Sequence, residues 1–193
     1  MKRDECLALL AARVREEAVV ATYQAAFDWM RLAPRDLNYV SIGAMGIASS
    51  HGLGLALGRP DRRVIVLDGD GSLLMNLGSL VTIAAAAPRN FVHLVCVNGA
   101  YEANGNHPLP GAGRLDFAAI AKGAGIADSG TIATLDGFAS SLDHILTGQG
   151  PIFRALKVTA GAPSNQDYDF IHGETARARF RAAFALPPGN RHA

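Results

Sequence analysis

The sequence predicts an α/β fold with one doubly wound, mainly parallel sheet and helices on both of its faces. Apolar segments of strand length alternate with segments of helix length, which is the order that a parallel sheet requires. The strands are nearly continuous apolar runs such as Val64–Leu67, so we expect both sheet faces to be covered. No internal repeat or interdomain linker is visible in the sequence. We therefore predict a single domain over residues 1–193.

The element boundaries follow from hydrophobic spacing and from the turn residues between segments. Helices are predicted where apolar residues recur every three or four positions, as at Cys6, Leu7, Leu10 and Val14. Strands are predicted where short apolar runs are bounded by polar residues, glycine or proline. In chain order, the predicted elements are helix 2–16, strand 18–22, helix 23–32, helix 46–58, strand 64–67, helix 72–86, strand 91–97, loop 98–113, helix 115–122, strand 125–127, helix 136–147, strand 152–158 and helix 174–184.

Composition and charge exclude several classes of protein. The chain has 193 residues, 49% hydrophobic and 18% charged, so it can bury one sizeable core. A net charge of +1 without a basic run argues against nucleic-acid binding. No segment reaches the length of a membrane span, and the charged N-terminus lacks a signal-peptide core. Since Cys96, one of two cysteines, lies in an apolar strand, we expect a buried thiol and a cytoplasmic protein.

Two polar side chains follow neighbouring predicted strands. Asp70 comes directly after strand 64–67, within Asp-Gly-Asp-Gly-Ser, and Asn98 follows strand 91–97. Because the carboxyl ends of neighbouring parallel strands meet at one edge of a sheet, these side chains can converge on one ion. A carboxylate, an amide and a loop carbonyl are hard oxygen ligands, which suit a magnesium ion that also holds a phosphate.

The residues around Asp70 favour a phosphate beside that ion. Gly69 and Gly71 flank Asp70 and allow the backbone to approach a bound anion closely. Ser72 opens a segment with helical periodicity, and the free N–H groups at that helix start would face a phosphate. An ordinary strand-to-helix turn is the alternative interpretation. The Asn-Gly-Ala-Tyr segment that begins at Asn98, at crossover distance, favours a diphosphate site instead.

These residues carry a resemblance to a known family. The Gly-Asp-Gly-Ser segment and the later Asn98 resemble the thiamine diphosphate motif. Residues 37–50 and 52–57, with their Gly-Ala-Met-Gly sequence, resemble the beta-type subunits of sulfopyruvate and phosphonopyruvate decarboxylases. The resemblance covers residues 5–160 and is most specific over 38–104. It implies a thiamine diphosphate-binding fold and two cofactors, thiamine diphosphate and Mg²⁺.

The resemblance also implies the roles of individual residues. Asp70, Asn98 and the Ala100 carbonyl would bind Mg²⁺, Gly43 would face the aminopyrimidine, and Met45 would be the apolar wedge that bends the cofactor. We expect the cofactor-binding residues to be Gly43, Met45, Asp70, Gly71, Ser72, Asn98, Tyr101 and Glu102. No catalytic side chain is assigned on this chain.

Two segments depart from the family pattern. The related subunits have a hydroxyl-rich turn after their first strand, where this chain has Thr22-Tyr-Gln-Ala-Ala-Phe27. Either Gln24 is a substitute donor there, or cofactor affinity is reduced or the site is reshaped. They also tend to have Thr-Gly-Gly-Gln where this chain has Asn106-His107, which leaves the substrate open. For His107 itself we favour an exposed loop position over a role in the site.

The family's ylid-forming glutamate lies on a separate pyrimidine-binding domain, for which there is no room before residue 38. We therefore expect no pyrimidine-binding domain on this chain and an alpha-type partner subunit that supplies it, in an α2β2 or larger heteromer. We expect the isolated chain to self-associate, and the substrate to be a small 2-oxo acid.

Three functions follow as hypotheses. The first is a subunit of a heteromeric 2-oxo acid decarboxylase, with a split acetolactate synthase-like carboligase as a variant. The second is a non-catalytic or regulatory thiamine diphosphate-binding module, which the altered turn at 22–27 motivates. The third, a Rossmann-type nucleotide binder, is disfavoured because no Gly-x-Gly-x-x-Gly follows the first strand.

Overall fold

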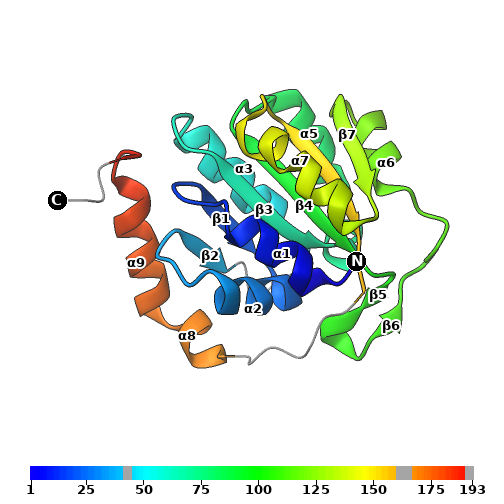
Figure 1. Cartoon of the computed structure of the whole chain (residues 1–193), viewed down its shortest axis with the longest axis horizontal. Coiled ribbons are helices and arrows are strands. Elements are labelled where there is room, and N and C mark those ends of the chain that lie inside the picture. Colours follow the sequence, from blue (N-terminus) through cyan, green and yellow to red (C-terminus); the bar gives the residue numbers. More distant parts are fainter. Residues whose placement is uncertain (41–44, 160–166, 190–193) are drawn as a thin grey trace.

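Six parallel strands form the central sheet of this computed structural model, which describes residues 1–40, 45–159 and 167–189 (Figure 1). Their order across the sheet is β2-β1-β3-β4-β8-β7, and each neighbouring pair is parallel. This is the predicted α/β architecture. The strands are β1 (Ala18–Ala21), β2 (Asn38–Val40), β3 (Val64–Gly69), β4 (Phe91–Val97), β7 (Asp128–Ile132) and β8 (Ile152–Lys157).

Two apolar clusters cover opposite faces of this sheet. One cluster joins the sheet to α1, α2 and α7, and the other joins it to α3, α4, α5 and α6. The strands are buried on both sides as a result, which explains why their sequences are continuously apolar. These helices are α1 (Arg3–Ala11), α2 (Tyr23–Leu32), α3 (Ala48–Gly58), α4 (Asp70–Leu74), α5 (Gly78–Ala86), α6 (Phe117–Gly123) and α7 (Leu135–Thr147).

The chain reverses its direction of travel across the sheet between β1 and β3. It moves outward from β1 to the edge strand β2, then returns past β1 to β3 and β4. Crevices outside the carboxyl ends of parallel strands at such a reversal are the usual ligand sites of open α/β sheets. Because Gly69 is in register with Cys96, the segments that follow β3 and β4 leave the sheet side by side.

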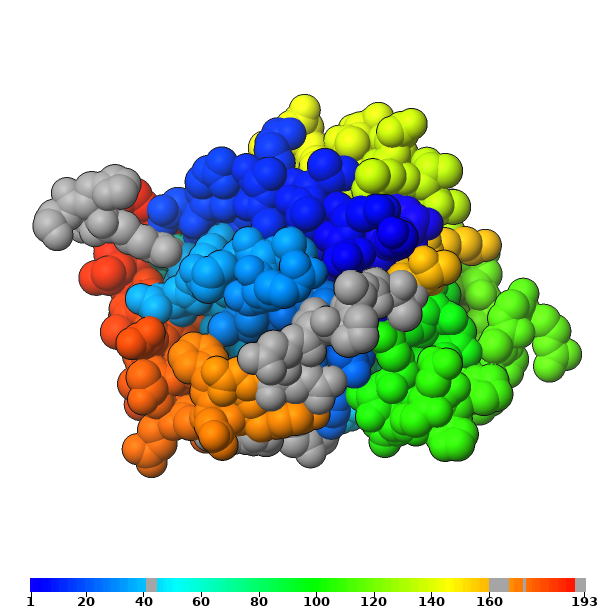
Figure 2. All heavy atoms as spheres, turned by 60° about the horizontal axis from the view of Figure 1, so that its bottom comes forward, coloured from blue at the N-terminus to red at the C-terminus, as the bar shows by residue number. Residues whose placement is uncertain are grey.

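Short elements complete the structure around this edge. The predicted loop 98–113 contains a small antiparallel pair of strands and one turn of 3-10 helix. Two further helices come after the last strand in the chain and lie near β2. In Figure 2 the dark-blue α1, the light-blue α2 and the green loop after β4 share one face of the molecule. These elements are β5 (Ala100–Tyr101), η1 (Glu102–Asn104), β6 (His107–Pro108), α8 (Tyr168–His172) and α9 (Glu174–Ala185).

Several elements differ from the sequence prediction, and the short helix α8 is one that was not predicted. The predicted helix 72–86 is two helices, α4 and α5, because Met75 and Asn76 form i→i−3 hydrogen bonds and the Asn76 amide donates to the Gly46 carbonyl at 2.7 Å. The strand predicted at 125–127 lies at Asp128–Ile132, and β2 was not predicted. Both are edge strands with polar residues, so hydrophobic runs do not mark them.

Among the helices of the described ranges, none has the length and apolar character needed to cross a membrane.

Candidate cofactor site at the carboxyl edge of the sheet

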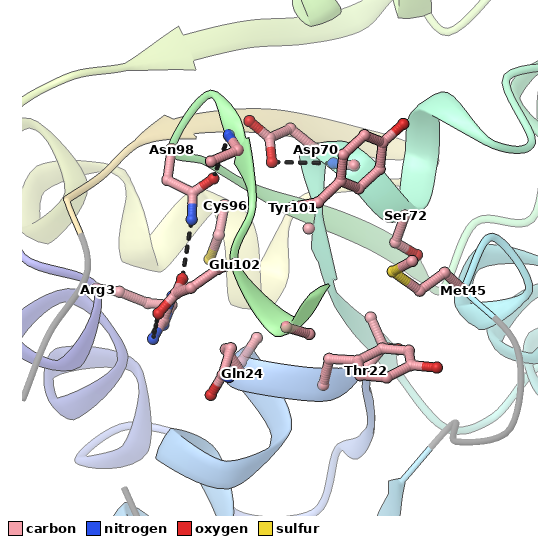
Figure 3. Close-up of a pocket in the computed structure, with 16 residues that line it drawn as sticks. Arg3, Thr22, Gln24, Met45, Asp70, Ser72, Cys96, Asn98, Tyr101 and Glu102 are labelled. Atoms are coloured by element: carbon pink, nitrogen blue, oxygen red, sulfur yellow. Dashed lines mark hydrogen bonds and ion pairs between the residues drawn. The ribbon is translucent and has the colours of Figure 1, made fainter. Parts of the chain in front are cut away.

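A pocket with about 450 Å³ of empty volume opens at the carboxyl ends of β1, β3 and β4 (Figure 3). It collects residues from the turn after β1, the segment before α3, the start of α4 and the loop after β4. The predicted site residues that line it are Met45, Asp70, Gly71, Ser72, Asn98, Ala100, Tyr101 and Glu102. Gly43, the remaining predicted residue, lies outside the described residues.

Asp70 is the first residue of α4, and its carboxylate is buried, with 2% of the residue exposed. Its Oδ1 accepts a hydrogen bond from Gly71 N–H at 2.9 Å, and its Oδ2 accepts one from Gly99 N–H at 2.7 Å. Burial raises the pKa of Asp70, and the backbone donors oppose that shift. Within the described part of the chain, no Lys, Arg or His forms an ion pair with this carboxylate.

The bond from Gly99 joins the β3–α4 turn to the loop that carries Asn98. Gly99 adopts a left-handed conformation, with φ +79°, which glycine allows at little cost. Gly71 is required for a different reason, since a Cβ there would lie 2.6 Å from the Tyr101 ring. The two glycines thus let the two loops approach closely and let Tyr101 pack on α4.

Asn98 is held by bonds at both ends of its side-chain amide. Its Oδ1 accepts from Ala100 N–H at 2.9 Å, and its Nδ2 donates to Glu102 Oε2 at 2.8 Å. The Glu102 carboxylate also accepts from Arg3, at 2.5 Å from Nη1 to Oε2. Arg3 in turn donates from Nε to Asp28 Oδ2 at 2.6 Å. Figure 3 shows Arg3, Glu102 and Asn98 lying in a row along one side of the pocket.

Sequence reasoning missed Arg3 and Asp28. Arg3 begins the pattern that continues with Cys6, Leu7 and Leu10, so it occupies a position on the buried face of α1. A charged residue at an apolar position of an amphipathic helix indicates a buried partner, because an unpaired buried charge is costly. That pattern was the available signal for Arg3, although it did not identify the partners.

The segment that carries Met45 is fixed to α4. Gly46 N–H donates to Ser72 Oγ at 3.0 Å, and the Gly46 carbonyl accepts from Asn76. These bonds hold Met45 at the wall of the pocket, beside Ser72 in Figure 3. The pocket therefore has one apolar wall opposite the polar row of Arg3 and Glu102.

The turn after β1 also reaches the pocket. Thr22 is buried, Gln24 lines the pocket, and Tyr23 between them has a positive φ of +44°. Positive φ in a bulky residue is a strained conformation that is typical of functional sites. His107, by contrast, is exposed and is not among the residues that line the pocket.

The donor set at this edge is composed of oxygen atoms. No group of three or more His, Cys, Asp or Glu that could hold a metal occurs in the ranges 1–40, 45–159 and 167–189. The predicted magnesium set does not need one, because it consists of one carboxylate, one amide oxygen and one main-chain carbonyl. Asp70 fits this set as a buried carboxylate with no cationic side chain paired to it among these residues.

The comparison with known families agrees with this geometry. A model of the family described as "Thiamine pyrophosphate enzyme, C-terminal TPP binding domain" matches residues 19–154, which include most of β1 and all of β3, β4 and the 98–113 loop. The chain belongs to this family of thiamine pyrophosphate enzymes. The predicted resemblance and the predicted fold are thereby confirmed.

Individual relatives place the chain more narrowly within the thiamine pyrophosphate enzymes. It is 36% identical to a phosphonopyruvate decarboxylase from Streptomyces viridochromogenes, over 93% of this chain and 45% of the relative. It is 40% identical to the sulfopyruvate decarboxylase subunit beta from Methanothermobacter thermautotrophicus, over 74% of this chain and 70% of the relative. The chain thus spans less than half of the Streptomyces protein.

A solved structure supports the fold. Benzoylformate decarboxylase from Polynucleobacter necessarius superposes with a TM-score of 0.66 at 22% identity, covering 86% of this chain and 34% of that protein. At this identity the likeness concerns the fold alone.

Proposed function

We propose that this chain is the thiamine diphosphate- and magnesium-binding subunit of a heteromeric 2-oxo acid decarboxylase similar to the sulfopyruvate and phosphonopyruvate enzymes. The observation that carries the proposal is the buried Asp70 carboxylate, which is joined through Gly99 to the loop of Asn98 and is paired with no cationic side chain of the described residues. A divalent cation at this point would neutralise Asp70 and attract a diphosphate. The names of the relatives supply the reaction class.

The residues of the pocket divide between the two ends of the cofactor. Asp70, Asn98 and the Ala100 carbonyl hold the magnesium ion, and Ser72 lies on the diphosphate side. Met45 and Tyr101 supply the apolar surface against the rings. Thiamine diphosphate, when bound, supplies the electron sink for cleavage of the bond to the carboxylate. This chain supplies binding, orientation and partial exclusion of water.

The proposal includes a partner of the alpha type. Relatives at 39–44% identity are named subunit beta, which supports a second kind of subunit. We propose that this partner contributes a pyrimidine-binding domain and closes the pocket, that the complex is α2β2 or larger, and that it works in the cytoplasm. Light scattering of the isolated chain should show self-association. A strictly monomeric chain that ignores every pyrimidine-domain candidate would contradict the subunit proposal.

Reconstitution tests the reaction. The purified chain is mixed with its pyrimidine-binding partner, thiamine diphosphate and Mg²⁺, and CO₂ release is measured with sulfopyruvate and phosphonopyruvate. We expect turnover that requires both subunits and both cofactors, with an aldehyde product. A carboligated product would assign the chain to a split acetolactate synthase-like enzyme instead. A demonstrated complex without turnover on any 2-oxo acid would refute the enzyme proposal.

The turn after β1 supports a second candidate, a non-catalytic or regulatory cofactor-binding module. This turn offers Thr22 and Gln24 to the pocket, but between them it places Tyr23, whose bulk replaces the hydroxyls of the related subunits. Calorimetry with thiamine diphosphate and Mg²⁺, with the partner present, separates the candidates. Binding without turnover would favour the module, and binding with turnover would favour the enzyme.

A further inference from the structure

Four polar side chains from separate parts of the chain form a continuous hydrogen-bonded row that ends at Asn98. Asp28 on α2 binds Arg3 on α1, Arg3 binds Glu102 on η1, and Glu102 binds Asn98 after β4. The three links measure 2.6, 2.5 and 2.8 Å between the bonded atoms. Three of these residues, Arg3, Asn98 and Glu102, also line the cofactor pocket.

Most of the row is buried, and its one cation, Arg3, lies between two carboxylates. Arg3 is 4% exposed and Asp28 is 1% exposed, while the Glu102 side chain is 22% exposed. Burial alone would lower the pKa of Arg3, but its bonds to Glu102 and Asp28 raise the pKa overall, so Arg3 remains a cation. Burying a guanidinium is costly unless carboxylates surround it, and here there are two.

Glu102 fixes the orientation of the Asn98 amide. A carboxylate can only accept hydrogen bonds, so the end of the amide that faces Glu102 must be the N–H₂ end. The Asn98 side-chain oxygen therefore points away from Glu102 and accepts from Ala100 N–H. Between Asn98 and Ala100, Gly99 N–H donates to Asp70. An amide that was free to flip would present N–H groups, which repel a cation, at the position of a ligand oxygen.

We propose that Glu102 is a positioning residue for Asn98, and that Arg3 and Asp28 hold Glu102 in place. The inference rests on the proposed function, in which Asn98 is a magnesium ligand. It deepens the predicted role of Glu102 in cofactor binding, because the carboxylate acts through the Asn98 amide. It also gives α1, which lies at the start of the chain, a role in the geometry of the metal site.

The hydrogen bonds of Glu102 allow its positioning role to be tested separately from its negative charge. Oε2 of Glu102 accepts from both Arg3 Nη1 and Asn98 Nδ2, whereas Oε1 accepts a longer bond from Arg3 Nη2, at 3.2 Å. In Glu102→Gln, the remaining oxygen can take the place of Oε2 and keep both of its bonds, although the charge and the longer bond from Arg3 Nη2 are lost. In Glu102→Ala both the bonds and the charge are lost. Either change leaves Arg3 paired with Asp28.

The experiment measures Mg²⁺-dependent thiamine diphosphate affinity by calorimetry, for the chain with its partner subunit. We expect Glu102→Ala to weaken that affinity about 10- to 100-fold, the range for residues that orient metal ligands. Glu102→Gln should restore most of it. Added to Asn98→Ala, Glu102→Ala should have little further effect, because its target is gone. Arg13→Ala, which removes an exposed ion pair with Asp143 at the turn just after α1, is the matched control and should leave affinity unchanged.

Each contrary result has a distinct meaning. A parent complex without Mg²⁺-dependent binding would overturn the proposed function, and this inference with it. Normal binding by the parent and by Glu102→Ala would overturn the positioning role alone. Equal losses in Glu102→Gln and Glu102→Ala would show that Glu102 acts through its charge, and additive losses with Asn98→Ala would show that it acts independently of Asn98. Both of the last two results would overturn the inference.

Discussion

Replacing Arg3 by methionine tests the buried row through its effect on folding. Methionine keeps an unbranched apolar side chain but removes the cation that contacts the carboxylates of Asp28 and Glu102. Asp28 is 1% exposed, so water cannot replace the lost partner without a change in structure. Removing one partner of a buried ion pair costs about 3–5 kcal/mol in the free energy of unfolding. For a chain of this size, that corresponds to a fall of roughly 6–20 °C in Tm.

The assay is urea unfolding followed by far-ultraviolet circular dichroism, with the free energy of unfolding obtained by linear extrapolation. Arg13→Met, in the turn just after α1, is the control, since Arg13 pairs with Asp143 at the surface, where both side chains are largely exposed. An exposed pair is worth less than about 1 kcal/mol. If Arg3→Met costs no more than Arg13→Met, the row does not stabilise the fold and the reasoning from burial is refuted.

The remaining predictions concern other ionisable groups. Burial raises the pKa of Asp128, but the hydrogen bonds from His144 and Arg154 outweigh this effect, and the pKa is lowered overall. The stability that the ionised Asp128 contributes is therefore present at neutral pH and is lost below about pH 4. Asp128→Asn should flatten that acid limb of the stability profile, and an unchanged limb would contradict the assignment. Burial raises the pKa of the Cys96 thiol to about 12 and that of Cys6 even further, so both should resist a thiol reagent at pH 8 until the chain unfolds. Rapid labelling of the folded chain would contradict this.

The predictable part of the fold is the part whose sequence reflects burial. β3 and β4 lie in the middle of the sheet and are buried on both faces, so each is a continuous apolar run that was assigned correctly. β2 and β7 are the edge strands, and their residues include Asn38, Asp128, Ser129 and Thr131. An edge strand tolerates polar residues because it is not fully buried. The local sequence pattern then does not distinguish such a strand from a loop.

In the site, too, some contacts can be predicted from the sequence and others cannot. The ends of β3 and β4 place Asp70 and Asn98 at one sheet edge, so chain order and parallel pairing were sufficient to bring them together. The contact between Arg3 on α1 and Glu102 on η1 joins residues 99 positions apart, and neither element belongs to the sheet. Spacing along the sequence carries no information about such a contact, although the charged residue on the buried face of α1 indicated that one exists.

The central claim is that Asp70 and Asn98 bind the magnesium ion that holds thiamine diphosphate. Calorimetry with the cofactor and Mg²⁺, for the chain with its partner subunit, tests it most directly in Asp70→Ala, Asn98→Ala and the surface control Asp143→Ala. We predict that Asp70→Ala abolishes Mg²⁺-dependent binding, because the only carboxylate proposed to bind the ion is lost. Asn98→Ala should weaken binding by less, since a neutral ligand is lost, and Asp143→Ala should bind normally. If Asp70→Ala and Asn98→Ala both bind thiamine diphosphate as tightly as the parent, the site assignment is wrong.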